Sequence, residues 1–159
     1  MVSDVNEFRL EKALACGADA AVNPAEESLH DAVDREFGAE RRADVIIDCA
    51  GVQQAIESAV SVARKGSEIV VVAVYEKTPQ VDSAAVNECE IRLTGTARYT
   101  VDDFETAVGL VSEGKIMLRE LITDEFELPE YLQAYEKIEK AAQTTMKVLV
   151  HVHADQFTQ

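Results

Sequence analysis

The chain has 159 residues, of which 47% are hydrophobic, so it can bury one sizeable core and is most simply one domain. With 30 acidic against 15 basic residues, its net charge of −15 predicts a surface that repels nucleic acid and anionic membranes. It has no apolar run near the ~20 residues that span a bilayer, and its start, MVSDVNEF, lacks the basic and apolar regions of a signal peptide. We therefore expect a cytoplasmic protein with neither nucleic acid nor membrane as a partner.

The first 75 residues alternate predicted strands with predicted helices. Apolar residues at strand or helix spacing, closed by glycine or by Asn-Pro, set the boundaries. In chain order, these elements are the end of a strand at 1–4, a helix at 7–16, a strand at 20–22, a helix at 25–37, a strand from 43, a helix at 52–64 and a strand at 68–75. Such alternation predicts an α/β fold whose parallel sheet is covered by helices on both faces.

The pattern changes after Tyr75, where helices and short strands follow a longer connection. A proline in the first turn favours the start of the last helix, and the terminal residues are expected to fray. In order, the expected elements are a loop with a short helix at 76–90, a strand at 91–95, a helix at 101–113, a strand at 122–126, a helix at 129–140, a strand at 147–152 and a frayed tail at 153–159.

The stretch ADVIIDCAG at 43–51 is the predicted centre of the sheet. Its unbroken β-branched run is typical of a parallel strand that is buried on both faces. Gly51 allows the backbone to turn and to approach another group closely. The stretch EIVVVAVY at 68–75 ends in the same way, and ligands of open α/β sheets lie at the carboxyl ends of strands. We interpret these two strand ends as facing a dinucleotide.

Asp4 is the first candidate binding residue, because it lies at the end of a strand and just before a helix. An acidic residue there binds the adenosine ribose in dinucleotide-binding folds, although it can equally cap the helix. Arg9 can lie against the adenine or a phosphate, or be a solvated surface residue. The glycine-rich turn expected about 20 residues before such an Asp has no counterpart, because only residues 1–3 precede Asp4.

The stretch TGTARYTVDDF at 94–104 places Arg98 and Tyr99 in a turn after a strand. They can bind an anionic or hydroxylated ligand, or be a surface Arg and a half-buried Tyr. His151, His153 and Asp155 alternate on the last strand, but no fourth ligand is evident, so we expect no metal site.

The remaining reactive side chains give no catalytic arrangement of the Ser/His/Asp or Cys/His kind, and we name no catalytic residue. The three cysteines have neither metal-ligand spacing nor a disulfide framework. We expect them to be buried free thiols; they are Cys16, Cys49 and Cys89.

Five segments together resemble a known family: NEFRLEKALACGADAAVNP, ADVIIDCAGVQQAIESAV, GSEIVVVAVYEKTPQ, LTGTARYTVDDFETAVGLVSEGKI and MKVLVHV. They are similar to the cofactor-binding half of zinc-dependent medium-chain alcohol dehydrogenases, nearest to 2,3-butanediol and sorbitol dehydrogenases, with threonine dehydrogenases nearby. The resemblance implies an incomplete Rossmann-like parallel sheet over residues 1–152, without the family's first strand and first helix, and a frayed tail at 153–159.

The resemblance also implies roles for particular residues. Asp4 would hold the adenosine ribose, Arg9 would lie at the adenosine end, and residues 72–74 would pass the nicotinamide ring. Arg98 and Tyr99 would reach the alcohol or polyol substrate. The cofactor-binding positions implied in this way are Asp4, Arg9, Ala50, Gly51, Val72, Ala73, Val74, Ala97 and Arg98.

A carboxylate at the ribose position repels a 2′-phosphate, so the resemblance implies NAD rather than NADP. The family's zinc polarises the alcohol oxygen for hydride transfer, but its ligands lie in a domain that these residues do not match. We therefore expect the cofactor-binding part of a dehydrogenase that transfers hydride from a secondary alcohol to NAD, inactive by itself. The alternative is a non-catalytic module for nucleotide binding or dimerisation.

The family's strand order, 3-2-1-4-5-6, would place the unmatched strand in the middle of the sheet. The strand stub before Asp4 would then pair directly with the strand from Ala43, leave exposed edges, or receive a strand from another chain. We expect a native-like remainder with a weak or open gap. The strand Ile91–Gly95 would pair with its two-fold mate, which implies a homodimer.

Overall fold

The structure, a computed structural model, describes residues 1–152, so the predicted tail at 153–159 lies outside the described residues. The chain divides into two compact units. The terminal unit contains residues 1–23 and 101–152 of the described part, and the central unit contains residues 24–100.

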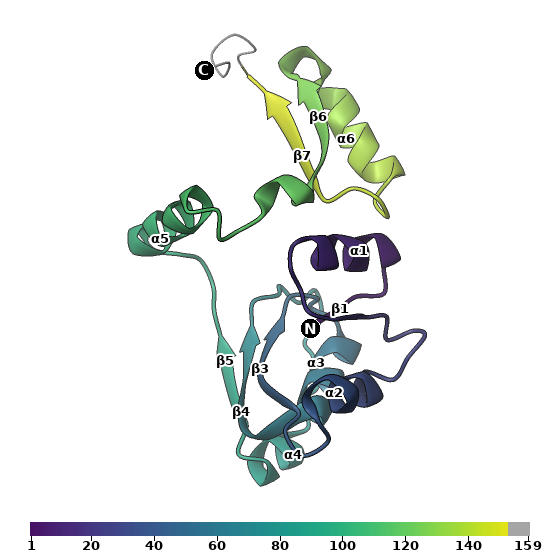
Figure 1. The fold of residues 1–159 in the computed structure, drawn as a ribbon, viewed down its shortest axis with the longest axis vertical. Helices are drawn as coiled ribbons and strands as arrows, with labels where there is room; N and C mark the ends of the chain where they lie inside the picture. Colours follow the sequence, from purple (N-terminus) through teal and green to yellow (C-terminus); the bar gives the residue numbers. More distant parts are fainter. Residues whose placement is uncertain (153–159) are drawn as a thin grey trace. The chain divides into compact units, whose positions relative to one another are not determined.

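The terminal unit is built from short elements at both ends of the chain (Figure 1). Asn6 caps the start of the first helix, because its side chain accepts a hydrogen bond from the Arg9 amide, one of the first-turn donors that have no partner within the helix. The elements are β1 (Val2–Ser3), α1 (Glu7–Ala15), β2 (Ala21–Val22), α5 (Val101–Ser112), η1 (Leu118–Leu121), β6 (Ile122–Glu127), η2 (Leu128–Glu130), α6 (Tyr131–Lys140) and β7 (Lys147–His151).

The central unit has a three-stranded sheet in the order β3-β4-β5 and three helices (Figure 1). The register aligns Ile46 of β3 with Ile69 of β4, and Ile69 with Leu93 of β5. The elements are α2 (Leu29–Phe37), β3 (Ala43–Asp48), α3 (Gln53–Val62), β4 (Ala63–Val71), α4 (Ser83–Glu88) and β5 (Arg92–Gly95).

Every strand pair within residues 1–152 is parallel, which confirms the predicted α/β class. The strands of this part of the chain form three sheets, β1-β2, β3-β4-β5 and β6-β7, rather than one sheet. Val2 aligns with Ala21, so the β1 stub takes β2 as its neighbour.

Two predicted helix boundaries are wrong. Helix α2 begins at Leu29 instead of Ala25, because the Ser28 hydroxyl accepts the Asp31 amide and caps the helix there. Helix α3 ends at Val62, and β4 begins at Ala63, which pairs with Ala43. The strand therefore starts five residues earlier than the apolar run predicts.

Gly66, the first glycine after the helix predicted at 52–64, lies within β4 with a φ of 76°. Its amide donates to the Cys89 carbonyl at 2.8 Å. The positive φ lets this amide leave the strand ladder and reach the end of α4, which glycine does at little steric cost.

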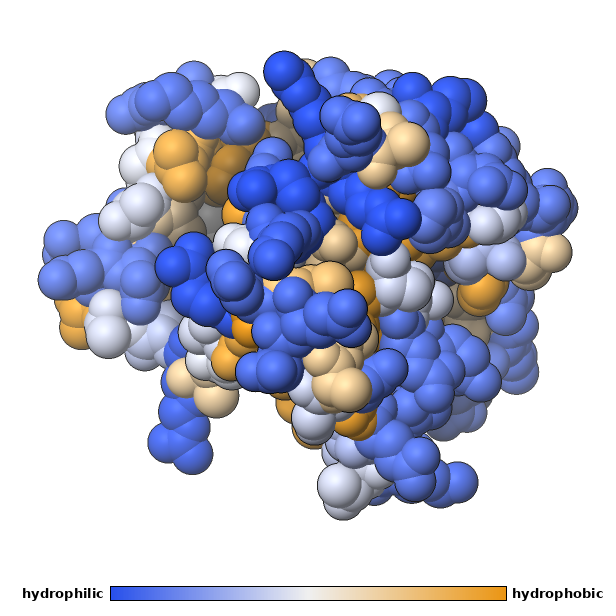
Figure 2. All heavy atoms as spheres, turned by 90° about the horizontal axis from the view of Figure 1, so that it is seen from below, coloured by the Kyte–Doolittle hydropathy of each residue, from blue (hydrophilic) through white to orange (hydrophobic). Residues whose placement is uncertain are grey.

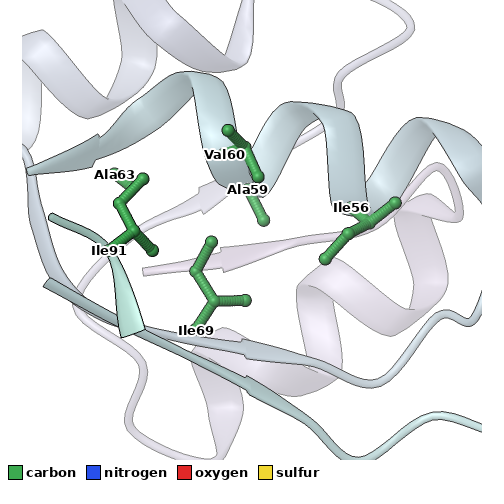
Figure 3. Packing of buried hydrophobic residues seen from close by; sticks show 6 residues of the cluster. All are labelled: Ile56, Ala59, Val60, Ala63, Ile69 and Ile91. Carbon is green, nitrogen blue, oxygen red and sulfur yellow. The ribbon is translucent and has the colours of Figure 1, made fainter. Parts of the chain in front are cut away.

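The core of the central unit lies between α3 and one face of the sheet (Figure 3). Ile56, Ala59 and Val60 of α3 face Ile69 of β4, which is fully buried. The six buried residues of the cluster are Ile56, Ala59, Val60, Ala63, Ile69 and Ile91. Fully burying an aliphatic side chain contributes about 1.5–3 kcal/mol, so this cluster fixes how α3 and α4 pack on the strands.

The prediction that β3 is buried on both faces is wrong. Ile46 packs against the core, whereas Val45 and Ile47 are 60% and 61% exposed. Alternate residues of a strand point to opposite faces, and helix α3 covers the Ile46 face while α2 packs against α3.

Hydrophilic residues cover most of the face shown in Figure 2, with apolar residues between them. No helix within residues 1–152 combines the length and the apolar character needed to cross a membrane. The three cysteines are free thiols; Cys16 and Cys89 are half-buried, and Cys49, in the turn after β3, is exposed, so the expectation of buried thiols is wrong for Cys49.

Candidate functional site

Asp4 follows β1 and is held by two neighbours. Its Oδ1 accepts the Asn6 amide at 2.9 Å, and its Oδ2 lies 3.6 Å from Nη1 of Arg9. Asn6, not Asp4, caps α1, since the Asn6 side chain accepts the Arg9 amide at 3.2 Å. The Asp4 side chain keeps 28% of its surface exposed. Its carboxylate can therefore accept further hydrogen bonds from a ligand.

A pocket of about 370 Å³ lies beside Asp4 in the terminal unit. Its wall combines β1, α1 and the segment between α5 and η1, and most of the side chains are apolar. The lining residues are Val2, Asp4, Arg9, Ala13, Cys16, Lys115, Ile116, Met117, Leu121 and Met146. Apolar walls suit the faces of a purine ring, the carboxylate suits vicinal hydroxyls, and Arg9 and Lys115 suit phosphate. This donor and acceptor set fits the adenosine half of a dinucleotide.

In the central unit, the turn after β3 touches the segment after β4. Gly51 has a φ of 67°, and a Cβ placed on it would lie 2.7 Å from the Val74 carbonyl oxygen. Only glycine fits this approach without a shift of the backbone. The predicted close approach at Gly51 is therefore present, and its partner in the structure is Val74. Val72 is 46% and Val74 is 92% exposed, so both offer surface to a ligand.

Asp48 connects these two segments, and sequence reasoning missed it. It is 5% exposed, and its Oδ1 accepts the amides of Ala50 at 2.9 Å and Gly51 at 3.4 Å. Its Oδ2 accepts the hydroxyl of Tyr75. Burial, the hydrogen bond to Asp48 and the charge of that carboxylate raise the pKa of Tyr75 to about 12. The sequence does contain a pattern that could have identified Asp48: it is an acidic residue at the end of an apolar strand, directly before a turn of small residues.

Ala97, Arg98 and Tyr99 follow β5 and are exposed. The Thr96 amide donates to the Val71 carbonyl at 3.0 Å, which attaches this segment to the end of β4. Arg98 has a φ of 70°, an uncommon conformation for a residue with a side chain. Tyr99 is 73% exposed, so the half-buried alternative for Tyr99 is wrong.

The last strand does not supply a metal site among the described residues. His151 Nε2 lies 2.5 Å from Oε2 of Glu125 on β6, and His153 and Asp155 lie outside the described residues. Within residues 1–152, no group of three or more His, Cys, Asp or Glu side chains is arranged to hold a metal ion. This donor set does not fit a catalytic zinc.

The predicted cofactor-binding residues fall into two groups. Asp4 and Arg9 lie together in the terminal unit. The others lie in the central unit, at the ends of its three strands; they are Ala50, Gly51, Val72, Ala73, Val74, Ala97 and Arg98.

Comparison with known proteins places the chain in a family. Residues 1–113 match the zinc-binding dehydrogenase family. The chain is 32% identical over 156 residues to 2-dehydro-3-deoxy-L-galactonate 5-dehydrogenase of Pseudoalteromonas atlantica, covering 98% of this chain and 45% of that protein. It is 30% identical over 138 residues to sorbitol dehydrogenase 1 of Saccharomyces cerevisiae, covering 84% of this chain and 39% of that protein.

The chain is also similar in structure to a solved dehydrogenase. A short-chain alcohol dehydrogenase of Escherichia coli CFT073, in complex with NADH, is similar with a TM-score of 0.82 and 26% identity, over 95% of this chain and 44% of that one. The chain thus spans less than half the length of these relatives. The chain belongs to the zinc-binding dehydrogenase family.

Proposed function

We propose that the chain binds NAD(H) and is the cofactor-binding part of a dehydrogenase that moves hydride between a secondary alcohol or polyol and the nicotinamide. The observation that carries this proposal is the pocket beside Asp4, whose apolar walls, carboxylate and cations suit adenosine and phosphate. The sorbitol dehydrogenase relative and the alcohol dehydrogenase solved with NADH support the same cofactor and substrate class.

In the terminal unit, Asp4 accepts hydrogen bonds from the ribose hydroxyls, and Arg9 lies at the adenosine end. The Asp4 carboxylate already has Arg9 at 3.6 Å, so its charge is partly balanced before a ligand arrives. A 2′-phosphate in place of the hydroxyl would meet this carboxylate, which favours NAD over NADP.

In the central unit, the strand ends receive the nicotinamide end. Val72, Ala73 and Val74 pass the ring, and Ala50 with Gly51 flanks it. Ala97 and Arg98 continue this surface after β5, where Arg98 and Tyr99 reach the alcohol. A bound nicotinamide would supply the hydride acceptor, and these residues would hold and orient it.

Catalysis needs a group that polarises the alcohol oxygen, and the described residues offer no site for the zinc that does so in this family. We therefore expect no alcohol oxidation by this chain alone. The second candidate is a non-catalytic module that binds a nucleotide or only dimerises.

A dimer would use the free edge of β5. Its four residues, Arg92–Gly95, are all exposed, and β4 is its neighbour on one side in the sheet. Two-fold pairing of this edge would join two sheets. Sedimentation at micromolar concentration is expected to show a dimer, and a monomer would contradict this part of the proposal.

Calorimetric titration of the chain with ADP-ribose, NADH and NADPH tests the cofactor proposal. We expect weak binding of the first two, with a Kd of roughly 10⁻⁴–10⁻³ M, and weaker binding of NADPH. Asp4→Asn removes the charge and one of the two acceptor oxygens, and a hydrogen bond to a charged group contributes about 1.5–3 kcal/mol, so this variant should bind ADP-ribose about tenfold more weakly.

Asp19→Asn is the matched control, because it removes the same charge from an exposed residue of the same unit. This control should leave the affinity for ADP-ribose unchanged. Equal affinity of the Asp4 variant and the wild type, or no binding of any of the three ligands, would refute the proposed site.

A further inference from the structure

We propose that Asp48 is a positioning residue which, with Tyr75, fixes the turn at 49–51 against the segment at 72–75 and so sets the shape of the surface for the nicotinamide end. The proposal rests on the proposed function for its ligand. It adds two residues, Asp48 and Tyr75, to which neither the family likeness nor the relatives give a role.

The side chain of Asp48 organises the turn that follows it. Its Oδ1 accepts the amides of Ala50 and Gly51, at 2.9 and 3.4 Å. A carboxylate that accepts amides two and three residues ahead stabilises a tight turn. This turn brings Gly51 to the Val74 carbonyl, where a Cβ would be only 2.7 Å away.

The backbone of Asp48 holds the second segment. Its carbonyl oxygen accepts the amides of Val72 and Ala73, each at 3.0 Å. The chain after β4 thus leaves the strand ladder and bends over the end of β3. One residue therefore bonds to both segments that carry the proposed nicotinamide surface.

Tyr75 ties this arrangement to the core. Its ring packs against the core cluster of the central unit, and its hydroxyl donates to Oδ2 of Asp48. Asp48 is 5% exposed, and both carboxylate oxygens are engaged. It therefore acts through the two segments that it holds, not by touching a ligand.

Four variants of the full chain test this role. Asp48→Ala removes the acceptor for both the turn and Tyr75, whereas Tyr75→Phe releases the segment at 72–75 and leaves the turn at 49–51. Asp48→Asn is the conservative variant, because its amide oxygen can accept the turn amides and its NH₂ group can donate to the Tyr75 oxygen. Asp44→Asn is the control: it makes the same chemical change in β3, at an exposed residue that contacts Arg64.

Affinities for NADH and ADP-ribose are compared for each variant, because ADP-ribose lacks the nicotinamide. We expect Asp48→Ala to weaken NADH about tenfold and Tyr75→Phe about threefold, with ADP-ribose unchanged. Asp48→Asn should restore most of the NADH affinity, and Asp44→Asn should match the wild type. Equal losses for the two ligands, or none in Asp48→Ala, would overturn the positioning role.

Amide hydrogen exchange separates this inference from the proposed function. If the wild type binds no dinucleotide, the proposed function fails, and the positioning role is then judged from the amides of Ala50, Gly51, Val72 and Ala73. Exchange at least tenfold faster in Asp48→Ala than in Asp44→Asn supports the fixed arrangement. Unchanged exchange at these four amides overturns it.

Discussion

Asp4 and Asp48 both stand at the carboxyl end of a parallel strand, and the two units use them differently. Asp4 keeps 28% of its side chain exposed beside a pocket, with one backbone amide and Arg9 as neighbours. Asp48 is 5% exposed, and its carboxylate accepts two amides and the Tyr75 hydroxyl. The same residue type at the same kind of position thus keeps exposed carboxylate surface in one unit and is fully engaged by the protein in the other.

This difference follows from what surrounds each carboxylate. A carboxylate that is open to solvent retains capacity for a ligand, while a buried one must be satisfied by the protein. The two aspartates should therefore differ in their contributions to stability and to binding. Substitution of each one tests this difference.

Asp48→Ala should have the largest effect on stability. It leaves the amides of Ala50 and Gly51 and the Tyr75 hydroxyl without their acceptor, which is expected to cost about 2–4 kcal/mol in the free energy of unfolding. Asp4→Ala should lower the free energy of unfolding by about 1 kcal/mol or less, because the Asn6 amide can donate to a water molecule instead. Urea denaturation of both variants measures this, and equal losses would remove the distinction between the two aspartates.

Gly51→Ala should have the next largest effect on stability. Gly17→Ala is its matched control. Both glycines have positive φ, 67° and 95°, but a Cβ meets the Val74 oxygen only at Gly51 and nothing within 4 Å at Gly17. The left-handed conformation alone costs about 1–2 kcal/mol, and the contact at Gly51 should add about 1–2 kcal/mol more. Thermal and urea unfolding should show the larger loss for Gly51→Ala; the reverse order would contradict the close approach.

The smallest effect concerns alkaline pH. The pKa of Tyr75 is raised to about 12, above an unfolded value of about 10. The folded state therefore keeps this proton while the unfolded state loses it, so the associated stability is complete below about pH 10 and is lost as the pH rises towards 12. Tyr75→Phe should flatten this decline and remove a phenolate absorbance step near pH 12; an unchanged titration curve would contradict the contact.

Local chemistry predicted much of the fold. Glycine closes two helices where the sequence predicts it: Gly17 follows the end of α1, and Gly38 ends α2. The start of α2 was placed four residues too early, because the helical pattern was extended back to Ala25, whereas the Ser28 side chain caps the helix at Leu29. The start of β4 was missed because Ala63 is set by its pairing with Ala43, which no local pattern encodes.

In the candidate site too, features encoded locally could be predicted, whereas features that depend on strand pairing could not. Asp4 could be named as a candidate because its position between a strand and a helix is visible in the chain itself. Asp48 and Tyr75 were missed because they are 27 residues apart and meet only when β3 and β4 pair. The exposure of Val45 and Ile47 was missed for a related reason, since a β-branched run does not say which face a helix covers.

The most direct test of the central claim is amide chemical-shift mapping of the full chain with AMP, which carries only the adenosine half of the cofactor. The account predicts saturable shifts at Asp4, Arg9 and Ala13 around the pocket, and none in α6. Shifts that saturate at α6 while these pocket residues stay unchanged, or no saturable shift up to about 10 mM AMP, would contradict an adenosine site beside Asp4.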